Sequence, residues 1–205
     1  MMMVGLTGGY ASGKSFVAAE LERLGCYLIY ADRLGHRALE PDGEAYAPTV
    51  EAFGREILGS DGRIDRKKLG TVVFRAPELL EKLTSFVHPA VFRLEEQMLK
   101  DFQTDHPRGI AVIEAAILIE TGRYKRFDRL ILTVCDEATQ ISRGMKRDGL
   151  SAEQVRERLR KQLPVAEKTP YADYVLDTSG EKQETIRRVQ AIYRDLKALA
   201  ETKQA

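Results

Sequence analysis

Residues 8–15 read Gly-Gly-Tyr-Ala-Ser-Gly-Lys-Ser, which matches the pattern G-x-x-x-x-G-K-[ST] of a phosphate-binding loop. An apolar run at 3–7 precedes the pattern, and helical spacing of apolar residues follows it. Glycines let the backbone approach a phosphate closely, and its N–H groups and the helix N-terminus attract negative charge. We expect Lys14 to reach the β- and γ-phosphates and Ser15 to hold Mg²⁺. The loop therefore predicts a nucleoside triphosphate site.

Two carboxylates follow predicted strands. Asp32 ends the second strand, at the edge of an open α/β sheet where ligands bind, and is expected to accept a hydroxyl proton or to hold Mg²⁺ through water. It is also compatible with a role as N-cap of a helix starting at Arg33. Glu114 ends the third strand and is either a metal or substrate contact or a buried, ion-paired residue.

The segment 139–170 holds eight Lys and Arg against four Asp and Glu. Arg143 and Arg147 share one helix face, which suits a polyphosphate, although a solvated face is the simpler explanation of such a run. A capping box begins at Ser151. An apolar stripe is then expected to run to Leu163, where Pro164 ends it; its members are Val155, Leu159 and Leu163. We predict a basic helical lid.

The stretch 42–106 shows helical periodicity and no convincing strand, with a turn at 59–62. It predicts an all-helical insertion. His88 and Pro89 are expected between two of its helices, where His88 is a substrate contact, a cap or a packed core residue.

The fold class is predicted from five apolar runs separated by helical patterns. Such runs fit parallel strands covered on both faces. We therefore expect a P-loop NTPase-type α/β fold with a doubly wound five-stranded parallel sheet. The strands are expected at 3–7, 26–30, 110–113, 130–134 and 174–176.

Composition excludes several classes of protein. The formal net charge of +1 disfavours a dedicated nucleic-acid binder. Cys26 and Cys135 fit no metal spacing and are expected to be reduced thiols. The most apolar stretch, 110–119, is about half the ~20 residues that a membrane helix needs, and the N-terminus does not resemble a signal peptide. We expect a cytoplasmic protein.

The chain contains no Asn, so it lacks the Asn-Lys-x-Asp guanine reader that a GTPase ordinarily carries. A small phosphate-loop domain with a helical insertion and a basic lid favours a phosphotransferase that closes over two substrates and excludes water. The acceptor stays open at this point. A nucleoside or nucleotide kinase is one alternative among enzymes, and a nucleotide-binding switch with slow turnover is the alternative from another class.

With these residues together, the chain resembles the dephospho-coenzyme A kinase family over about residues 3–195. Residues 6–15 reproduce the family opening, and 30–32 stand at its acidic motif, whose base falls on Asp32. Residues 62–66 and the pair at 88–89 are similar to signatures of an acceptor-binding insertion. The resemblance extends to the lid at 140–151 and to the final strand with an adenine-cradling loop at 172–180.

The resemblance implies one kinase domain over residues 1–205, with a core at 1–32, 107–138 and 171–205, a helical acceptor-binding insertion at 33–106 and a lid at 139–170. It implies ATP and dephospho-coenzyme A as partners, Mg²⁺ as cofactor, no nucleic acid or membrane partner, and a monomer or weak homo-oligomer. The catalytic residues are then Asp32, Lys14 and Arg143. The other implied site residues are, for ATP, Gly8, Gly9, Ala11, Ser12, Gly13, Lys14, Ser15, Phe16, Arg147, Ser179 and Gly180; for the acceptor, Thr7, Asp32, Arg66, His88 and Glu114; and for the metal, Ser15.

Several positions depart from the family pattern. Ala11 and Phe16 replace the usual Gly and Thr around the phosphate loop, and Tyr30 replaces the first aspartate of the acidic motif. Residues 114–116 read Glu-Ala-Ala where the family usually has Asp-x-Pro, and Thr178 replaces an Asn. Because Ala lacks the freedom of glycine at positive φ, an altered loop geometry is expected at Ala11.

Overall fold

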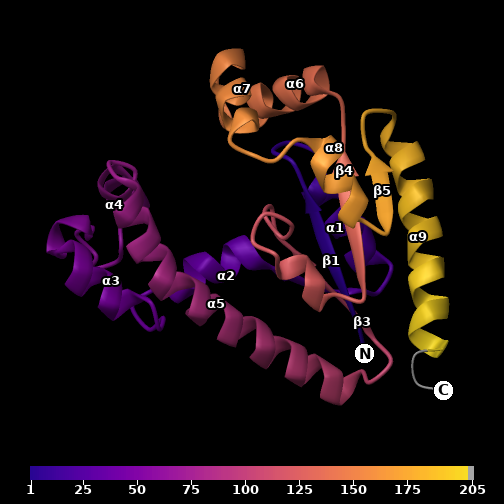
Figure 1. Cartoon of the computed structure of the whole chain (residues 1–205). Helices are drawn as coiled ribbons and strands as arrows, with labels where there is room; N and C mark the ends of the chain where they lie inside the picture. The colour runs from indigo at the N-terminus through magenta and orange to yellow at the C-terminus, as the bar shows by residue number, and fades with distance from the viewer. Residues whose placement is uncertain (203–205) are drawn as a thin grey trace. The chain divides into compact units, whose positions relative to one another are not determined.

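The computed structural model describes residues 1–202 and contains a five-stranded parallel sheet with the order β2-β3-β1-β4-β5 (Figure 1). The strands span Met2–Gly8 (β1), Tyr27–Tyr30 (β2), Ile110–Glu114 (β3), Arg129–Val134 (β4) and Tyr174–Asp177 (β5). The predicted α/β class and parallel sheet are confirmed. The order changes direction at β1, so the loop after β1 lies at the point where open α/β sheets bind ligands.

Buried apolar side chains explain why these segments pair as strands. All five residues of β3 are buried, and β1 is buried from Val4 onward. Strands covered on both faces read as continuous apolar runs, which is the pattern in this sequence. Helices α1 (Lys14–Arg23) and α9 (Lys182–Thr202) pack against each other and against strands of the sheet.

The lid is formed by α6 (Glu137–Asp148), α7 (Ala152–Arg160) and α8 (Val165–Lys168). The capping box at Ser151 is present as predicted, with Gln154 as its partner. The predicted apolar stripe is wrong at its end, because α7 ends at Arg160 and Leu163 lies outside it with 38% of its surface exposed. The chain therefore leaves the helix before Pro164.

The chain separates into two compact units, which we call the sheet unit (1–29 and 102–202) and the helical unit (Tyr30–Asp101). The helical unit contains α2 (Ala31–Ala38), α3 (Tyr46–Phe53), a 3₁₀ turn at Arg55–Ile57, α4 (Arg66–Val73) and most of α5 (Pro77–Asp105). Its two apolar cores are centred on Ala38, Ala45, Ala90 and Val91, and on Phe53, Ile57, Leu69 and Val73. Between its helices, Leu58 and Ile64 form an isolated antiparallel β-bridge.

The structure corrects two predictions in the helical unit. Pro89 lies inside α5, so His88 is a mid-helix residue and does not lie between two helices. A proline inside a helix removes one hydrogen bond and costs about 3 kcal/mol, but Ala90 and Val91 directly after it are buried in the core. Helix α2 begins at Ala31 with Tyr30 as its N-cap, so Asp32 is the second residue of the helix and not a cap.

Within residues 1–202, no helix is long and apolar enough to cross a membrane. Cys26 is buried, Cys135 is half-buried, and both are free thiols. Burial raises the pKa of the Cys26 thiol to about 12, which keeps it protonated and unreactive near neutral pH.

Candidate functional site: a phosphate loop beside a basic lid

The phosphate loop requires glycine at two of its positions. Gly8 has φ of 156°, and a Cβ there would lie 2.2 Å from the hydroxyl oxygen of Thr133. Gly13 has φ of 84° directly before α1, and its Cβ would lie 2.9 Å from Thr178 Oγ1. Because backbone and side chains approach this closely, the loop closes tightly and presents the N-terminus of α1, whose first N–H groups lack partners within the helix.

Ala11 adopts the left-handed conformation with φ of 57°, the only non-glycine residue in the described chain that does so. Ala11 thus takes a backbone conformation that glycine adopts freely, and an L side chain there costs on the order of 1–2 kcal/mol. Whether the loop geometry is altered by the alanine stays a prediction. The surroundings hold the conformation, since the Ala11 carbonyl accepts a contact from Cys135 Sγ at 3.8 Å.

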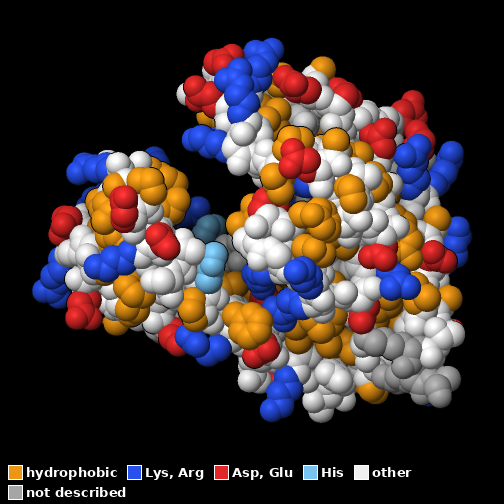
Figure 2. All heavy atoms as spheres, viewed as in Figure 1, with side chains coloured by type: hydrophobic (Ala, Val, Ile, Leu, Met, Phe, Trp, Pro, Cys, Tyr) orange, Lys and Arg blue, Asp and Glu red, His pale blue; other side chains and the backbone are white. Residues whose placement is uncertain are grey.

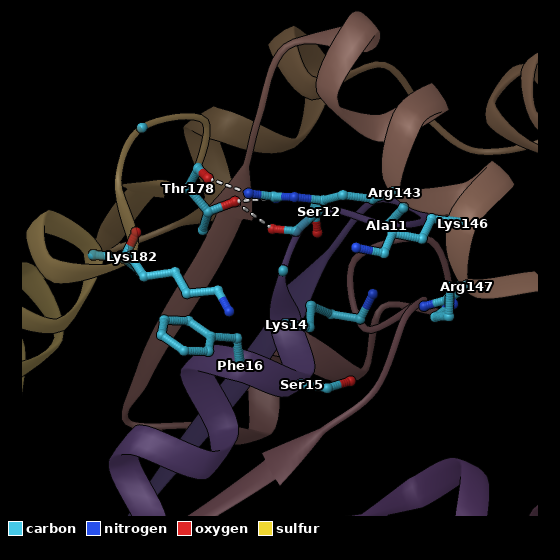
Figure 3. A pocket seen from close by; sticks show the side chains of 13 residues that line it. Ala11, Ser12, Lys14, Ser15, Phe16, Arg143, Lys146, Arg147, Thr178 and Lys182 are labelled. Carbon is cyan, nitrogen blue, oxygen red and sulfur yellow. Dashed lines mark hydrogen bonds between the residues drawn. The ribbon is translucent and has the colours of Figure 1, made fainter.

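Lys14 and Ser15 open α1 on the cavity side of the loop. The Lys14 ammonium donates to the carbonyl oxygens of Gly8 at 2.9 Å and Gly9 at 3.1 Å, so it lies across the loop. The Ser15 side chain is exposed and lines the same cavity (Figure 3). A positive charge and a free-standing hydroxyl are thus placed next to the helix N-terminus, the arrangement that binds nucleotide phosphates.

A cavity of about 570 Å³ extends from the loop between the lid and the start of α9. Figure 3 shows that cationic side chains from three elements point toward it: Lys14 from α1, Arg143, Lys146 and Arg147 from α6, and Lys182 from α9. The remaining lining residues are Ala11, Ser12, Gly13, Ser15, Phe16, Thr178, Gly180 and Thr185. A cavity of this size with this concentration of positive charge suits a polyphosphate ligand.

Thr178 connects the loop to the lid. Its hydroxyl donates to the Ser12 carbonyl at 2.9 Å and accepts from Arg143 Nη1 at 2.9 Å. Arg143 Nη2 also donates to the Thr178 carbonyl at 2.6 Å. The side chain of Thr178 is buried, so both bonds are shielded from water, and they hold the Arg143 guanidinium at the wall of the cavity (Figure 3).

The structure brings most of the predicted nucleotide residues to this cavity, but not all of them. Gly8, Gly9 and Ser179 do not line it, and the Ser179 hydroxyl instead accepts from the Asp136 N–H at 3.0 Å. Thr7 is fully buried, and its hydroxyl donates to the Ala116 carbonyl at 3.3 Å. Glu114 is buried as the last residue of β3.

Sequence reasoning missed four lining residues: Lys146, Thr178, Lys182 and Thr185. Lys146 lies between the two predicted arginines of α6, and the local basic charge could have indicated it. Thr178 follows β5, Lys182 and Thr185 belong to α9, and all three reach the cavity only through folding over more than a hundred intervening positions. No local signal marks them.

In the helical unit, two predicted acceptor residues have a common neighbour. His36 follows Asp32 by one turn of α2, and its pKa is lowered by partial burial and then by the positive charge of Arg66, while Asp32 opposes this effect. Arg66 is the first residue of α4. Asp32, His36 and Arg66 are exposed and form one charged cluster, whereas His88 is exposed on α5. The i, i+4 spacing of Asp32 and His36 could have revealed His36.

Comparison with known proteins identifies similar chains. The dephospho-CoA kinase family model matches residues 2–184. A dephospho-CoA kinase of Aquifex aeolicus is 39% identical over 96% of this chain and 98% of its own length. A dephospho-CoA kinase of Geobacter sulfurreducens is 41% identical over 94% of this chain and 98% of its own length. The crystal structure of TT1252 from Thermus thermophilus matches with a TM-score of 0.80 and 33% identity, over 95% of this chain and 97% of that one.

Proposed function

The chain belongs to the dephospho-CoA kinase family. We propose that the protein binds ATP in the cavity and transfers its γ-phosphate to the ribose 3′-hydroxyl of dephospho-coenzyme A. Enzymes of this family are phosphotransferases that carry out the last step of coenzyme A biosynthesis. The observation that carries the proposal is the convergence of five cationic side chains and a phosphate loop on one cavity. A triphosphate supplies the matching negative charge.

In this proposal the loop N–H groups and Lys14 bind the β- and γ-phosphates. Arg143 and Arg147 neutralise the charge that develops on the transferring group and on the leaving ADP. The bond between the 3′-oxygen and the γ-phosphorus forms while the bond to the β,γ-bridging oxygen breaks. The fixed donors contribute most because phosphoryl transfer needs positioning and charge stabilisation more than covalent chemistry.

Asp32 is proposed to orient the 3′-hydroxyl and to accept its proton. Its side chain is exposed, so it is open to an incoming acceptor. Arg66 and His36 belong to the same charged cluster and would bind the anionic part of the acceptor, and His88 of α5 is proposed as a further contact. Thr7 and Glu114, both buried in the sheet unit, are proposed as further acceptor-binding residues.

The residues present fit Mg²⁺ held mainly by the nucleotide. Mg²⁺ usually binds one or two protein oxygens together with substrate phosphates and water. The exposed Ser15 hydroxyl at the cavity wall supplies one such oxygen, and no cluster of three or more acidic, His or Cys residues forms an all-protein cage within 1–202. When bound, the ion would screen the charge on the β- and γ-phosphates.

We also propose that the protein works in the cytoplasm, as a monomer or weak homo-oligomer, without nucleic-acid or membrane partners. Two free cysteines support a reducing compartment. The near-neutral formal charge of +1 gives no general attraction to nucleic acid or anionic lipid.

The test is an acceptor panel with Mg·ATP that measures ADP formation. We expect turnover with dephospho-coenzyme A far above that with nucleoside monophosphates, thymidine, shikimate or water. A nucleoside monophosphate as the best acceptor would contradict the proposed substrate and leave the kinase chemistry intact. ATP binding without turnover on any acceptor would favour a nucleotide-dependent switch.

A further inference from the structure

Tyr10, at an unspecified (x) position of the phosphate-loop pattern, contacts the lid through its ring, its hydroxyl and its backbone. Its ring lies beneath two lid guanidiniums, with the Arg147 carbon 4.9 Å and the Arg158 carbon 5.3 Å from the ring centroid. Its hydroxyl donates to Asp148 Oδ2. The face of an aromatic ring carries negative charge density that attracts cations, so the ring and the two guanidiniums form stabilising cation–π interactions.

The lid leaves space for this ring. A Cβ on Gly144 of α6 would lie 2.7 Å from Tyr10 Cε1 and 3.2 Å from its hydroxyl oxygen. Gly144 is buried in the middle of a helix, where glycine costs roughly 1 kcal/mol relative to alanine. Its presence is explained by the close approach of Tyr10 to the helix backbone.

Two glutamines hold the backbone of the same residue. Gln140 Nε2 donates to the Tyr10 carbonyl at 2.7 Å, and the Tyr10 N–H donates to Gln162 Oε1 at 2.7 Å. Gln140 lies on α6 and Gln162 lies between α7 and α8, so two separate segments of the lid bind the carbonyl and the N–H of one residue. The contacts fix the loop and the lid in one relative position.

Asp148 joins this contact to the nucleotide cavity. It accepts from Arg147 Nε at 2.8 Å and Nη2 at 3.0 Å, and from Arg158 Nη1 at 3.3 Å. Hydrogen bonds from Arg147 and Tyr10 lower the pKa of Asp148 to about 2, so it stays ionised at neutral pH. Arg147 lines the cavity, whereas Tyr10 is not among the described residues that do so.

We propose that Tyr10 is a positioning residue that ties the lid to the phosphate loop and thereby fixes Arg147 at the cavity wall. It acts through Arg147 and does not touch the phosphates. Figure 2 shows acidic and basic side chains mixed over α6 and α7, and there Arg147 and Arg158, the two arginines over the Tyr10 ring, both pair with Asp148. The proposal rests on the proposed function only in assigning Arg147 to ATP.

The experiment compares Tyr10→Ala, Tyr10→Phe, Arg147→Ala and the double variant Tyr10→Ala/Arg147→Ala. Tyr10→Ala should lower kcat/KM for ATP by about tenfold, equivalent to about 1.4 kcal/mol of transition-state binding. Tyr10→Phe keeps the ring under both guanidiniums and should retain activity within about threefold of wild type. In the Arg147→Ala background, Tyr10→Ala should lower kcat/KM for ATP by less than about a further twofold, since its effect passes through Arg147.

Tyr174→Phe is the matched control. It removes another tyrosine–aspartate hydrogen bond, to Asp195 at 3.2 Å, on β5 and α9 away from the lid, and should leave kinetics unchanged. If Tyr10→Ala does not fold, Gly144→Ala displaces the ring from the lid side and should give the same loss. Wild-type kinetics in Tyr10→Ala or Gly144→Ala, or equal losses from Tyr10→Ala with and without Arg147, would overturn the proposal.

A second readout does not depend on the acceptor. Titration calorimetry with ATP alone should show weaker binding to Tyr10→Ala than to wild type, and amide hydrogen exchange should be faster across 137–163 in the variant. If wild type fails to phosphorylate dephospho-coenzyme A while these differences persist, the proposed substrate is wrong and the role of Tyr10 stands. If exchange and ATP affinity are unchanged, the role of Tyr10 is wrong whatever the acceptor.

Discussion

The sheet unit and the helical unit hold their charged groups in different ways. In the sheet unit, the Lys14 ammonium donates to two loop carbonyls, and the Arg143 guanidinium donates to both the hydroxyl and the carbonyl of Thr178. In the helical unit, Asp32, His36 and Arg66 are exposed on helices, with no hydrogen bond to fix them comparable to that of Arg143. Preorganised donors cost no reorganisation when charge develops, whereas exposed groups must be ordered by the substrate. In the proposed function, the sheet unit therefore supplies charge stabilisation and the helical unit supplies recognition.

Lys14→Ala removes a preorganised charge of the sheet unit and should have the largest effect on kcat. In the proposed function the ammonium contacts the transferring phosphate in ground and transition states, so kcat should fall by about 10³-fold and ATP affinity should also fall. The fold should persist, because Lys14 lines the cavity and its ammonium bonds two loop carbonyls rather than the apolar core. Steady-state kinetics, ATP calorimetry and thermal melting measure the three effects.

The control for this variant is Lys67→Ala, which removes an exposed lysine of α4 and should leave kcat unchanged. Wild-type turnover in Lys14→Ala would mean that the phosphate site is assigned to the wrong residues.

In the helical unit, Asp32→Asn separates an effect on the chemical step from an effect on ATP binding. Asn is nearly the same size but cannot accept the hydroxyl proton, and general bases are typically worth about 10²–10⁴-fold. We expect kcat to fall by about 10²-fold, equivalent to about 2.7 kcal/mol. ATP affinity should change by less than about threefold, because Lys14 and the loop are untouched.

Asp42→Asn, an exposed acid of the same unit that pairs with Arg37, is the matched control. Near-normal kcat in Asp32→Asn would leave that residue only its favourable interaction with the α2 dipole. A large loss of Mg·ATP affinity with a small change in kcat would instead place it in the metal shell.

Thr178→Val tests whether the preorganisation of Arg143 matters. The change is nearly isosteric, but it removes the acceptor for Arg143 Nη1 and the donor to the Ser12 carbonyl. Loss of one hydrogen bond to a charged group should lower kcat by about tenfold. Thr178→Ser restores the hydroxyl and should recover most of the lost kcat. If Thr178→Val and Thr178→Ser both keep the kcat of the wild type, Arg143 needs no such support.

The phosphate loop and the strands could be predicted from sequence because their causes are local. Eight consecutive residues determine the loop, and continuous apolar runs mark strands that are buried on both faces. The N-cap prediction for Asp32 was wrong by two residues, since Tyr30 caps the helix instead, and helix boundaries are the least determined part of a local pattern.

The rest depends on contacts between distant segments. The break at His88–Pro89 was predicted from a local proline signal, which packing of Ala90 and Val91 overrides. Thr178 could be noted only as a departure from a family pattern, because its bonds join positions more than thirty and more than one hundred and sixty residues away. Tyr10 carries no sequence signal at all, since its lid contacts exist only in the folded chain.

The smallest expected effect concerns the pKa of His36, which reports on the charged cluster without any turnover. Arg66 disfavours protonated His36 and Asp32 favours it. Arg66→Ala should therefore raise the pKa of His36, and Asp32→Asn should lower it. Because the three side chains are exposed, both shifts should be modest and should shrink as salt is raised above ~0.1 M, where charges are screened within about 10 Å. Histidine NMR titration measures them, with His106 of the sheet unit as an internal reference. Opposite shifts that shrink with salt establish that Asp32 and Arg66 act on one site from two sides. If neither substitution moves the His36 titration, the two residues do not form one acceptor site, and the recognition role assigned to the helical unit loses its physical basis.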